Sequence, residues 1–404
     1  MPSTFTNLPL TEAAAPRWLV VLLAAACGLI GANLYYAQPL IGPISESLGL
    51  SSRAAGLIVT MSQLGYGLGL LFVVPLGDLI ENRRLISTIL SVAVLALLGA
   101  SVCRWPSMFL AAALLIGFGS VAVQVLVPYA AHLVSQDMRG RVVGNVMSGL
   151  MLGIMLARPV SSLVADLLSW RAVFMMSSAL IACLTVFLAI VLPARQPSGR
   201  LRYHTLLTSM FHLLRDNRVL QRRSLYHAFL FGTFSLYWTV VPLVLTDRYH
   251  LSQKGIALFA LVGVAGAVSA PFAGRAADRG WTTAATFSSM ITVAAALVIG
   301  ANAPYGSPVG LVMLLVAAIL VDAGVAAHFV LGQRAMFLLG ADIRSRLNGL
   351  YMAIFFSGGA LCSALGGWAY AHGGWGLTMR VAVALPLLAI ACYLTESWDS
   401  RVRD

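Results

Sequence analysis

The sequence consists mainly of long apolar blocks whose length matches the thickness of a lipid bilayer. Twelve such blocks follow one another, separated by short polar or turn-forming segments. A helix needs about 20 mainly apolar residues to cross the hydrocarbon core of a bilayer, and the blocks lack the strict alternation of barrel strands. We therefore predict twelve membrane-spanning helices, at residues 18–41, 55–76, 85–103, 107–133, 141–163, 170–192, 225–246, 255–275, 284–302, 308–337, 346–371 and 375–394.

The composition excludes a soluble protein. Of the 404 residues, 59% are hydrophobic and only 10% are charged, whereas about a quarter of the residues of a soluble domain are charged. The five cysteines all lie inside apolar blocks and show no paired spacing, so we expect neither a disulfide framework nor a metal site. The sequence shows no cluster of His, Cys or carboxylate ligands, so we expect no cofactor and no enzymatic activity.

The net charge of +12 is explained by orientation in a membrane rather than by a nucleic-acid partner. If both termini lie on one side, nineteen of the 26 basic residues share that side, including seven arginines of the polar stretch 193–224. Lys and Arg are enriched in cytoplasmic loops. We therefore expect a multi-pass membrane protein, surrounded by the lipid bilayer, with no nucleic-acid partner and both termini in the cytoplasm.

The chain repeats itself in two halves. Residues 137–141 (Asp-Met-Arg-Gly-Arg) match residues 342–346 (Asp-Ile-Arg-Ser-Arg), and residues 34–36 match residues 236–238. Six spans return the chain to its starting side, so the two repeats share one orientation in the membrane. This arrangement suits a protein in which one half rocks against the other. We predict a cytoplasmic tail at 1–17, six-helix bundles at 18–192 and 225–394, a cytoplasmic linker at 193–224 and a second tail at 395–404.

Several motifs resemble those of one transporter family, the major facilitator superfamily. Residues 274–280 (Gly-Arg-Ala-Ala-Asp-Arg-Gly) are similar to its loop motif after span eight, while the copy after span two, residues 77–84, departs from the usual spacing. Residues 33–39, 156–161 and 344–352 resemble a bacterial branch of sugar-efflux or drug-efflux permeases. The resemblance covers essentially the whole chain and implies a location in the bacterial inner membrane. It implies an all-α membrane protein with twelve helices in two parallel, pseudo-symmetric six-helix bundles, working by alternating access and usually driven by the proton gradient.

One carboxylate, Asp322, lies deep inside a predicted span, some 22 Å from its cytoplasmic end at about 1.5 Å per residue. An ionised carboxylate there costs roughly 2.5–3.5 kcal/mol on insertion scales, and removal from water favours its protonated form. We predict that Asp322 is the proton-coupling group. The alternative is a structural carboxylate that bonds to a facing helix.

One arginine, Arg158, also lies inside a span and is followed by Pro159. Its side chain keeps its charge, so it must pair, reach water or meet a ligand. Asp166, two helical turns further outward, is a possible partner. Two roles stay open for Arg158, a gate between spans five and eight or a contact with an anionic substrate.

Other polar and aromatic residues are candidates for a substrate cavity, because the resemblance implies that spans one, four, seven and ten line one. Tyr and Trp offer an apolar face with a hydrogen-bonding tip, which suits amphiphilic solutes, although aromatic residues also anchor helix ends at the membrane interface. His328 is equally explained as a packed core histidine. The candidates are Asn33, Tyr35, Tyr36, Gln38, Gln124, Arg158, Tyr237, Trp238, His328 and Gln333.

Two aspartates, Asp78 and Asp278, end their spans at the predicted cytoplasmic face, each followed by arginines. Such charges can pair across the two halves in one state and separate in the other. Ordinary orientation charges would explain the arginines but not the repeated aspartate. We predict a cytoplasmic latch formed by Asp78, Arg83, Arg84, Asp278, Arg279, Arg139 and Arg344.

These observations predict a monomeric secondary transporter. Its partners would be protons and a small organic solute such as a drug, a sugar or a secreted metabolite, for example a siderophore, moved by proton-coupled efflux. Only the resemblance favours efflux, so uptake of a nutrient together with protons stays open. A non-transporting receptor is a weaker alternative, because no predicted soluble segment is long enough for a signalling domain.

Overall fold

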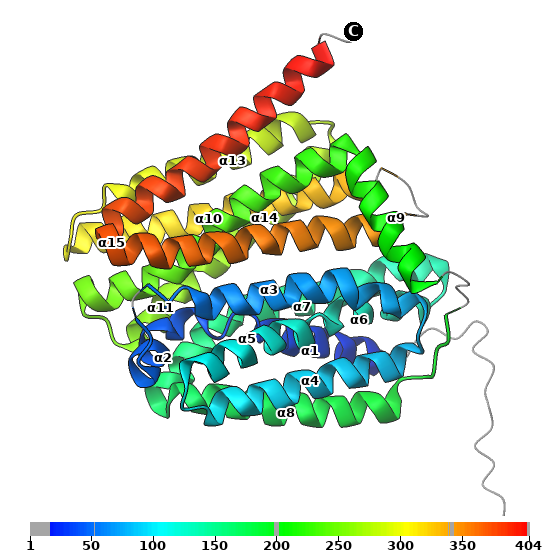
Figure 1. Cartoon of the computed structure of the whole chain (residues 1–404). Helices are drawn as coiled ribbons and strands as arrows, with labels where there is room; N and C mark the ends of the chain where they lie inside the picture. Colours follow the sequence, from blue (N-terminus) through cyan, green and yellow to red (C-terminus); the bar gives the residue numbers. More distant parts are fainter. Residues whose placement is uncertain (1–16, 52, 198–201, 338, 340–342, 402–404) are drawn as a thin grey trace, which may run out of the picture.

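The chain folds into two groups of long helices that lie side by side. This computed structural model describes residues 17–51, 53–197, 202–337, 339 and 343–401. In Figure 1 the helices of the first half (blue to green) form the lower group, and most helices of the second half (green to red) form the upper group. The first half contains α1 (Arg17–Ala32), η1 (Gln38–Leu40), α2 (Ile41–Leu48), α3 (Leu57–Phe72), η2 (Val74–Asp78), α4 (Asn82–Val102), α5 (Pro106–Ser120), α6 (Ala122–His132), α7 (Gln136–Leu167) and α8 (Trp170–Val191).

The second half repeats this arrangement after a connecting helix, α9 (Tyr203–Asp216). We call the end of the bundle that carries α9 the linker end, and the opposite end, where α2 and the start of α11 lie, the distal end (Figure 1). The second half contains α10 (Arg218–Tyr249), α11 (Gln253–Gly263), η3 (Val264–Val268), α12 (Ser269–Asp278), α13 (Thr282–Ala301), α14 (Pro308–Phe337) and α15 (Arg344–Arg401).

The prediction of twelve spans in two six-helix bundles is confirmed. Within the described residues, nine helical stretches are long and apolar enough to cross a membrane, and α1 and α11 are shorter apolar helices. The last stretch holds two spans, because the backbone leaves helical geometry at Gly373 and Gly374. Gly374 has a φ of +58°, a conformation that side chains with a Cβ disfavour. The chain therefore turns there from the eleventh span into the twelfth.

Two spans that we predict as continuous helices are broken. The first, 18–41, ends its helix at Ala32, and the chain passes through turns and η1 before α2 begins. Pro39 lies in η1, and a proline favours such a break because it has no N–H to donate. The eighth, 255–275, is interrupted by η3. A Cβ at Gly263, the last residue of α11 before this interruption, would lie 2.6 Å from a carboxylate oxygen of Asp322, so a residue without a side chain lies against that carboxylate.

The predicted linker, 193–224, is partly helical. It contains α9 and the first residues of α10, which begins at Arg218. The helix α9 touches both halves: the hydroxyl of Tyr203 donates to the carbonyl of Phe72 in α3 at 2.8 Å, and Arg346 of α15 donates to Ser209 at 2.9 Å. The linker therefore crosses the linker end of the bundle as a packed element.

Direct hydrogen bonds join the two halves in the distal part of the bundle. Thr60 of α3 donates to the carbonyl of Ala360 in α15 at 2.9 Å, and Ser162 of α7 donates to the side chain of Gln253 in α11 at 3.0 Å. Close to these bonds, a Cβ on Gly367 would lie 2.8 Å from the backbone nitrogen of Gly56. The two halves are thus in tight contact at the distal end.

Candidate functional site

The charged side chain of Arg158 is buried between the two halves. It extends from α7, is only 4% exposed, and its Nε donates to Oε1 of Gln38 at 2.7 Å. Gln38 lies in η1 and is fully buried. The break in the first span therefore has a structural consequence, because it places the Gln38 amide opposite the guanidinium.

Three aromatic rings surround the guanidinium of Arg158. Its Cζ lies 5.4 Å from the ring centroid of Tyr35, 4.8 Å from that of Phe234 and 4.3 Å from that of Trp238. Distances below about 6 Å allow cation–π attraction, which is stronger away from water. Tyr35 belongs to the first half, whereas Phe234 and Trp238 belong to α10 of the second half. The positive charge is thus held by both halves.

The carboxylate of Asp322 contacts the same Trp238 indole whose ring lies against Arg158. Nε1 of Trp238 donates to Oδ1 of Asp322 at 2.7 Å, and Asp322 is close enough to Arg158 for an electrostatic interaction between the two charges. In the described part of the chain, no ion pair joins them directly. The structure therefore brings the two intramembrane charges of the sequence to one place, where both contact the indole of Trp238.

This arrangement gathers five of the predicted candidates, which are Tyr35, Gln38, Arg158, Trp238 and Asp322. Asp166, a possible partner of Arg158 in the sequence, has a different partner in the structure. The Oδ1 atom of Asp166 accepts a hydrogen bond from the backbone N–H of Lys254 at 3.1 Å, so it stabilises the first turn of α11, where a negative charge is favourable.

Other predicted cavity residues in the first half bond within that half. Oδ1 of Asn33 accepts from Ser177 of α8 at 2.5 Å, and Tyr36 also interacts with Ser177. Gln124 of α6 donates to the hydroxyl of Tyr66 at 2.9 Å. These contacts hold helices of one bundle together, and the structure does not bring these residues to Arg158.

In the second half, Tyr237 and Gln333 likewise bond within their own bundle. The hydroxyl of Tyr237 donates to the carbonyl of Leu314 at 2.7 Å, and Gln333 donates to Asn348 at 3.2 Å. Tyr237 nevertheless packs edge-on against Trp238, with ring centroids 6.1 Å apart. Tyr237 therefore contributes to the site by packing against the ring of Trp238.

His328 belongs to a buried cluster that the sequence did not reveal. Its Nδ1 lies 3.3 Å from Nδ1 of His227 in α10, and the hydroxyl of Tyr351 also contacts that nitrogen of His227. Both imidazoles are almost fully buried. His227 has the same signal as His328, an imidazole inside an apolar block, so the sequence would have supported naming both.

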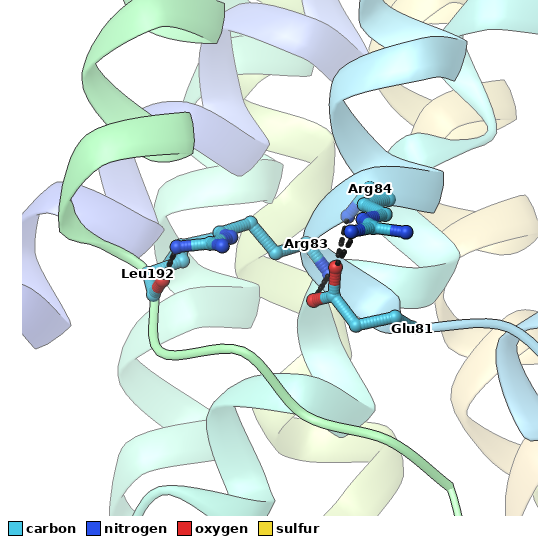
Figure 2. A network of polar contacts seen from close by, with 4 residues as sticks. All are labelled: Glu81, Arg83, Arg84 and Leu192. Atoms are coloured by element: carbon cyan, nitrogen blue, oxygen red, sulfur yellow. Dashed lines mark hydrogen bonds and ion pairs between the residues drawn. The ribbon is translucent and has the colours of Figure 1, made fainter.

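Arg83 and Arg84, two predicted latch residues of the first half, lie in the first turn of α4. Glu81 caps α4, because its carboxylate accepts the backbone N–H groups of Arg83 at 2.9 Å and Arg84 at 3.2 Å. The guanidinium of Arg83 turns the other way and donates to the carbonyl of Leu192 at 3.4 Å. Figure 2 shows these contacts: the Glu81 bonds lie at the start of α4, and the Arg83 bond joins this start to the end of α8 within one half.

The remaining latch candidates lie at the linker end. Asp278 pairs with Arg334 of the same half, and Asp78 lines a small pocket together with Arg346 of the other half. Arg279 lies 5.9 Å from the ring of Trp281, Arg139 is exposed, and the side chain of Arg344 lies outside the described residues. The prediction that these charges form a latch stays a prediction.

Replacing the cap residue, Glu81→Ala, is expected to lower the stability of the protein. The substitution removes the acceptor for two N–H groups at the start of α4, and loss of a helix cap costs ~1 kcal/mol. Thermal unfolding of the purified protein in detergent measures this as a lower melting temperature. The matched control is Arg84→Ala, which removes an exposed charge from the same turn; equal effects of the two changes would contradict the capping role.

Comparison with known proteins identifies the family. A sequence model described as the Major Facilitator Superfamily matches residues 21–330. The chain belongs to this superfamily. It is a multi-pass membrane transporter, and the predicted resemblance is confirmed.

Relatives within the superfamily cover most of the chain. The uncharacterized transporter YgaY of Escherichia coli O157:H7 is 39% identical over 88% of this chain and 90% of its own length. A probable transporter of Streptomyces coelicolor is 34% identical over 92% of this chain and 86% of its own length. A chloramphenicol resistance protein of Streptomyces lividans is 26% identical over 65% of this chain and 67% of its own length.

Solved structures of the superfamily share the fold. A bacterial homologue of the human lysosomal transporter Spinster, in an inward-facing and unoccupied conformation, superposes with a TM-score of 0.71 at 14% identity, covering 94% of this chain and 97% of its own. The nucleoside transporter NupG also has a TM-score of 0.71, at 15% identity, covering 93% of this chain and 99% of its own. At these identities the likeness concerns the fold alone.

Proposed function

We propose that this transporter moves a small organic solute by coupling it to protons at the site formed by Arg158, Trp238 and Asp322. The observation that carries the proposal is the position of Asp322, a carboxylate in a membrane-spanning helix that receives a hydrogen bond from Trp238. Ionisable residues at such depth are costly and mark proton or ion pathways. The protein would work as a monomer, because the whole site is built from one chain.

The two charges of the site belong to different halves, which connects protonation to movement. Arg158 lies on α7 and Asp322 on α14. When the distal end is closed, the positive field of Arg158 stabilises the negative charge of Asp322. A movement that opens the distal end separates the two, so Asp322 then takes up a proton from the distal side. Closure brings Arg158 back and favours release of the proton toward the linker end.

Export in exchange for protons is the first candidate for the direction of transport. The motifs that resemble efflux permeases support it, and so does the similarity to a chloramphenicol resistance protein. The exported solute would be a drug, a sugar or a secreted metabolite. The bias of arginines toward the linker end favours a cytoplasmic location of both termini, and the bacterial relatives favour a bacterial inner membrane. Protons that move from the distal end to the linker end would therefore enter the cell.

Uptake together with protons is the second candidate, and one observation favours it. Nη2 of Arg158 and Nε2 of Gln38 are buried donors that have no acceptor among the described residues. An anionic group bound there would neutralise Arg158 and thereby strengthen proton binding at Asp322. Such a solute would travel in the same direction as the proton.

Proton movement in proteoliposomes tests the proposal and separates the two candidates. With a pH-sensitive dye trapped inside, addition of a solute outside is expected to make the lumen alkaline if solute and proton exchange, and acidic if they travel together. Chloramphenicol and benzoate serve as probes, with protein-free liposomes as the control for passive entry of the acid. Solute entry through the protein without any proton movement would overturn proton coupling.

A further inference from the structure

Two hydrogen-bond donors, on side chains of the site that contact one another, have no acceptor within the part of the chain that the structure describes. Nη2 of Arg158 and Nε2 of Gln38 are both buried, and neither has a partner within the described residues. The two side chains are already fixed relative to one another by the bond from Arg158 Nε to Gln38 Oε1. A buried donor without an acceptor costs ~1–3 kcal/mol. The two donors therefore destabilise the closed site unless a further group supplies an acceptor for them.

The shape of the surroundings restricts what can complete this pair. The rings of Tyr35, Phe234 and Trp238 lie around the guanidinium of Arg158, with its Cζ over each of the three rings. Hydrogen bonds from a guanidinium to a carboxylate are charge-assisted and therefore strong. Two donors suit the two oxygens of one carboxylate better than the larger number of oxygens on a phosphate. The aromatic rings provide apolar contact for the rest of the solute.

We infer that Arg158 and Gln38 form the binding site for the carboxylate of an organic anion, the solute of this transporter. One carboxylate oxygen accepts from Nη2 of Arg158 and the other from Nε2 of Gln38. The inference rests on the proposed transport function and specifies its substrate class as a monocarboxylate with an apolar or aromatic body.

Electrostatics then fixes the sign of coupling to Asp322. Arg158 is the positively charged group that acts on Asp322, and Asp322 in turn acts on the hydroxyl groups of Tyr35 and Tyr237. A carboxylate bound to Arg158 neutralises the charge that stabilises the Asp322 anion. Anion binding and protonation of Asp322 therefore reinforce one another, which corresponds to the uptake candidate or to release of an acid down its own gradient.

Binding to the purified protein in detergent tests the inference. Benzoate is expected to bind more tightly than benzamide, which has the same shape without the charge, and phenylacetate and cyclohexanecarboxylate extend the series. Arg158→Gln is expected to weaken benzoate binding about tenfold or more, because hydrogen bonds to charged groups are the strong ones. Gln38→Glu places a carboxylate beside Arg158 and is expected to abolish binding with little change in side-chain size, so it keeps the test valid if Arg158→Gln does not fold.

Several results would overturn the anion site: equal binding of benzoate and benzamide, unchanged benzoate binding in Gln38→Glu, or no binding by any carboxylate of the series. Proton uptake on binding, measured in weakly buffered solution with a pH indicator, is a separate readout. It is expected in the natural protein and absent in Asp322→Asn. If benzoate binds through Arg158 without proton uptake, the anion site stands and the coupling role of Asp322 in the proposed function fails.

Discussion

Replacement of the intramembrane carboxylate, Asp322→Asn, is expected to reduce proton-driven transport to background. The amide introduced by this substitution would retain an oxygen that can accept the hydrogen bond from Trp238, which in the natural protein joins Nε1 to Oδ1 of Asp322 at 2.7 Å. The amide cannot take up or release a proton in the physiological pH range, so the geometry of the site would persist while its titration is lost. Solute accumulation in proteoliposomes under an imposed pH gradient measures the effect.

Counterflow separates loss of coupling from loss of the site. In this assay, labelled solute outside exchanges with unlabelled solute inside, and no net proton movement is needed. We expect Asp322→Asn to retain counterflow and to lose its dependence on pH. Asp166→Asn is the matched control, because this carboxylate lies at the end of α7 and bonds to the backbone of Lys254. Proton-driven accumulation by Asp322→Asn would refute the coupling role.

The sequence predicted the architecture and the two charged residues, Arg158 and Asp322, whose burial in the membrane costs free energy. Long apolar blocks and the bias of the arginines are properties of local composition, so they can be counted without a structure. Arg158 and Asp322 were predicted for the same reason, since each is a charge inside an apolar block. Their proximity could not be predicted, because α7 and α14 belong to different halves and their closeness depends on how the halves pack.

The contacts that these residues make could not be predicted from the sequence. Gln38 was predicted as a cavity residue, but its bond to Arg158 depends on the break after Ala32, which hydropathy does not resolve because the apolar block continues across it. Glu81 was not predicted as a cap, because the residues that usually signal a helix start directly before it are Ser, Thr, Asp and Asn. Phe234 was missed because an aromatic residue in an apolar span gives no signal of its own.

A large side chain at the distal contact, Gly367→Leu, is expected to abolish transport without unfolding the protein. A Cβ at this position would lie 2.8 Å from the backbone nitrogen and 3.0 Å from the Cα of Gly56 in the other half. Backbone atoms cannot yield as a flexible side chain would, so the two halves would be held apart at the distal end. Transport needs both closure and opening, and a protein that cannot close there would bind solute without carrying it across.

Cysteine labelling distinguishes this arrest from a general loss of structure. Ser162 is fully buried and bonds to Gln253 across the distal contact, so Ser162→Cys, in a variant whose five native cysteines are replaced, reports on opening. With Gly367→Leu we expect faster labelling by a membrane-impermeant maleimide and a melting temperature close to that of the parent. Gly376→Leu is the matched control, since a Cβ there meets nothing within 4 Å. If Gly367→Leu abolishes transport but leaves the labelling rate unchanged, the role of Gly367 in closure of the distal end is refuted.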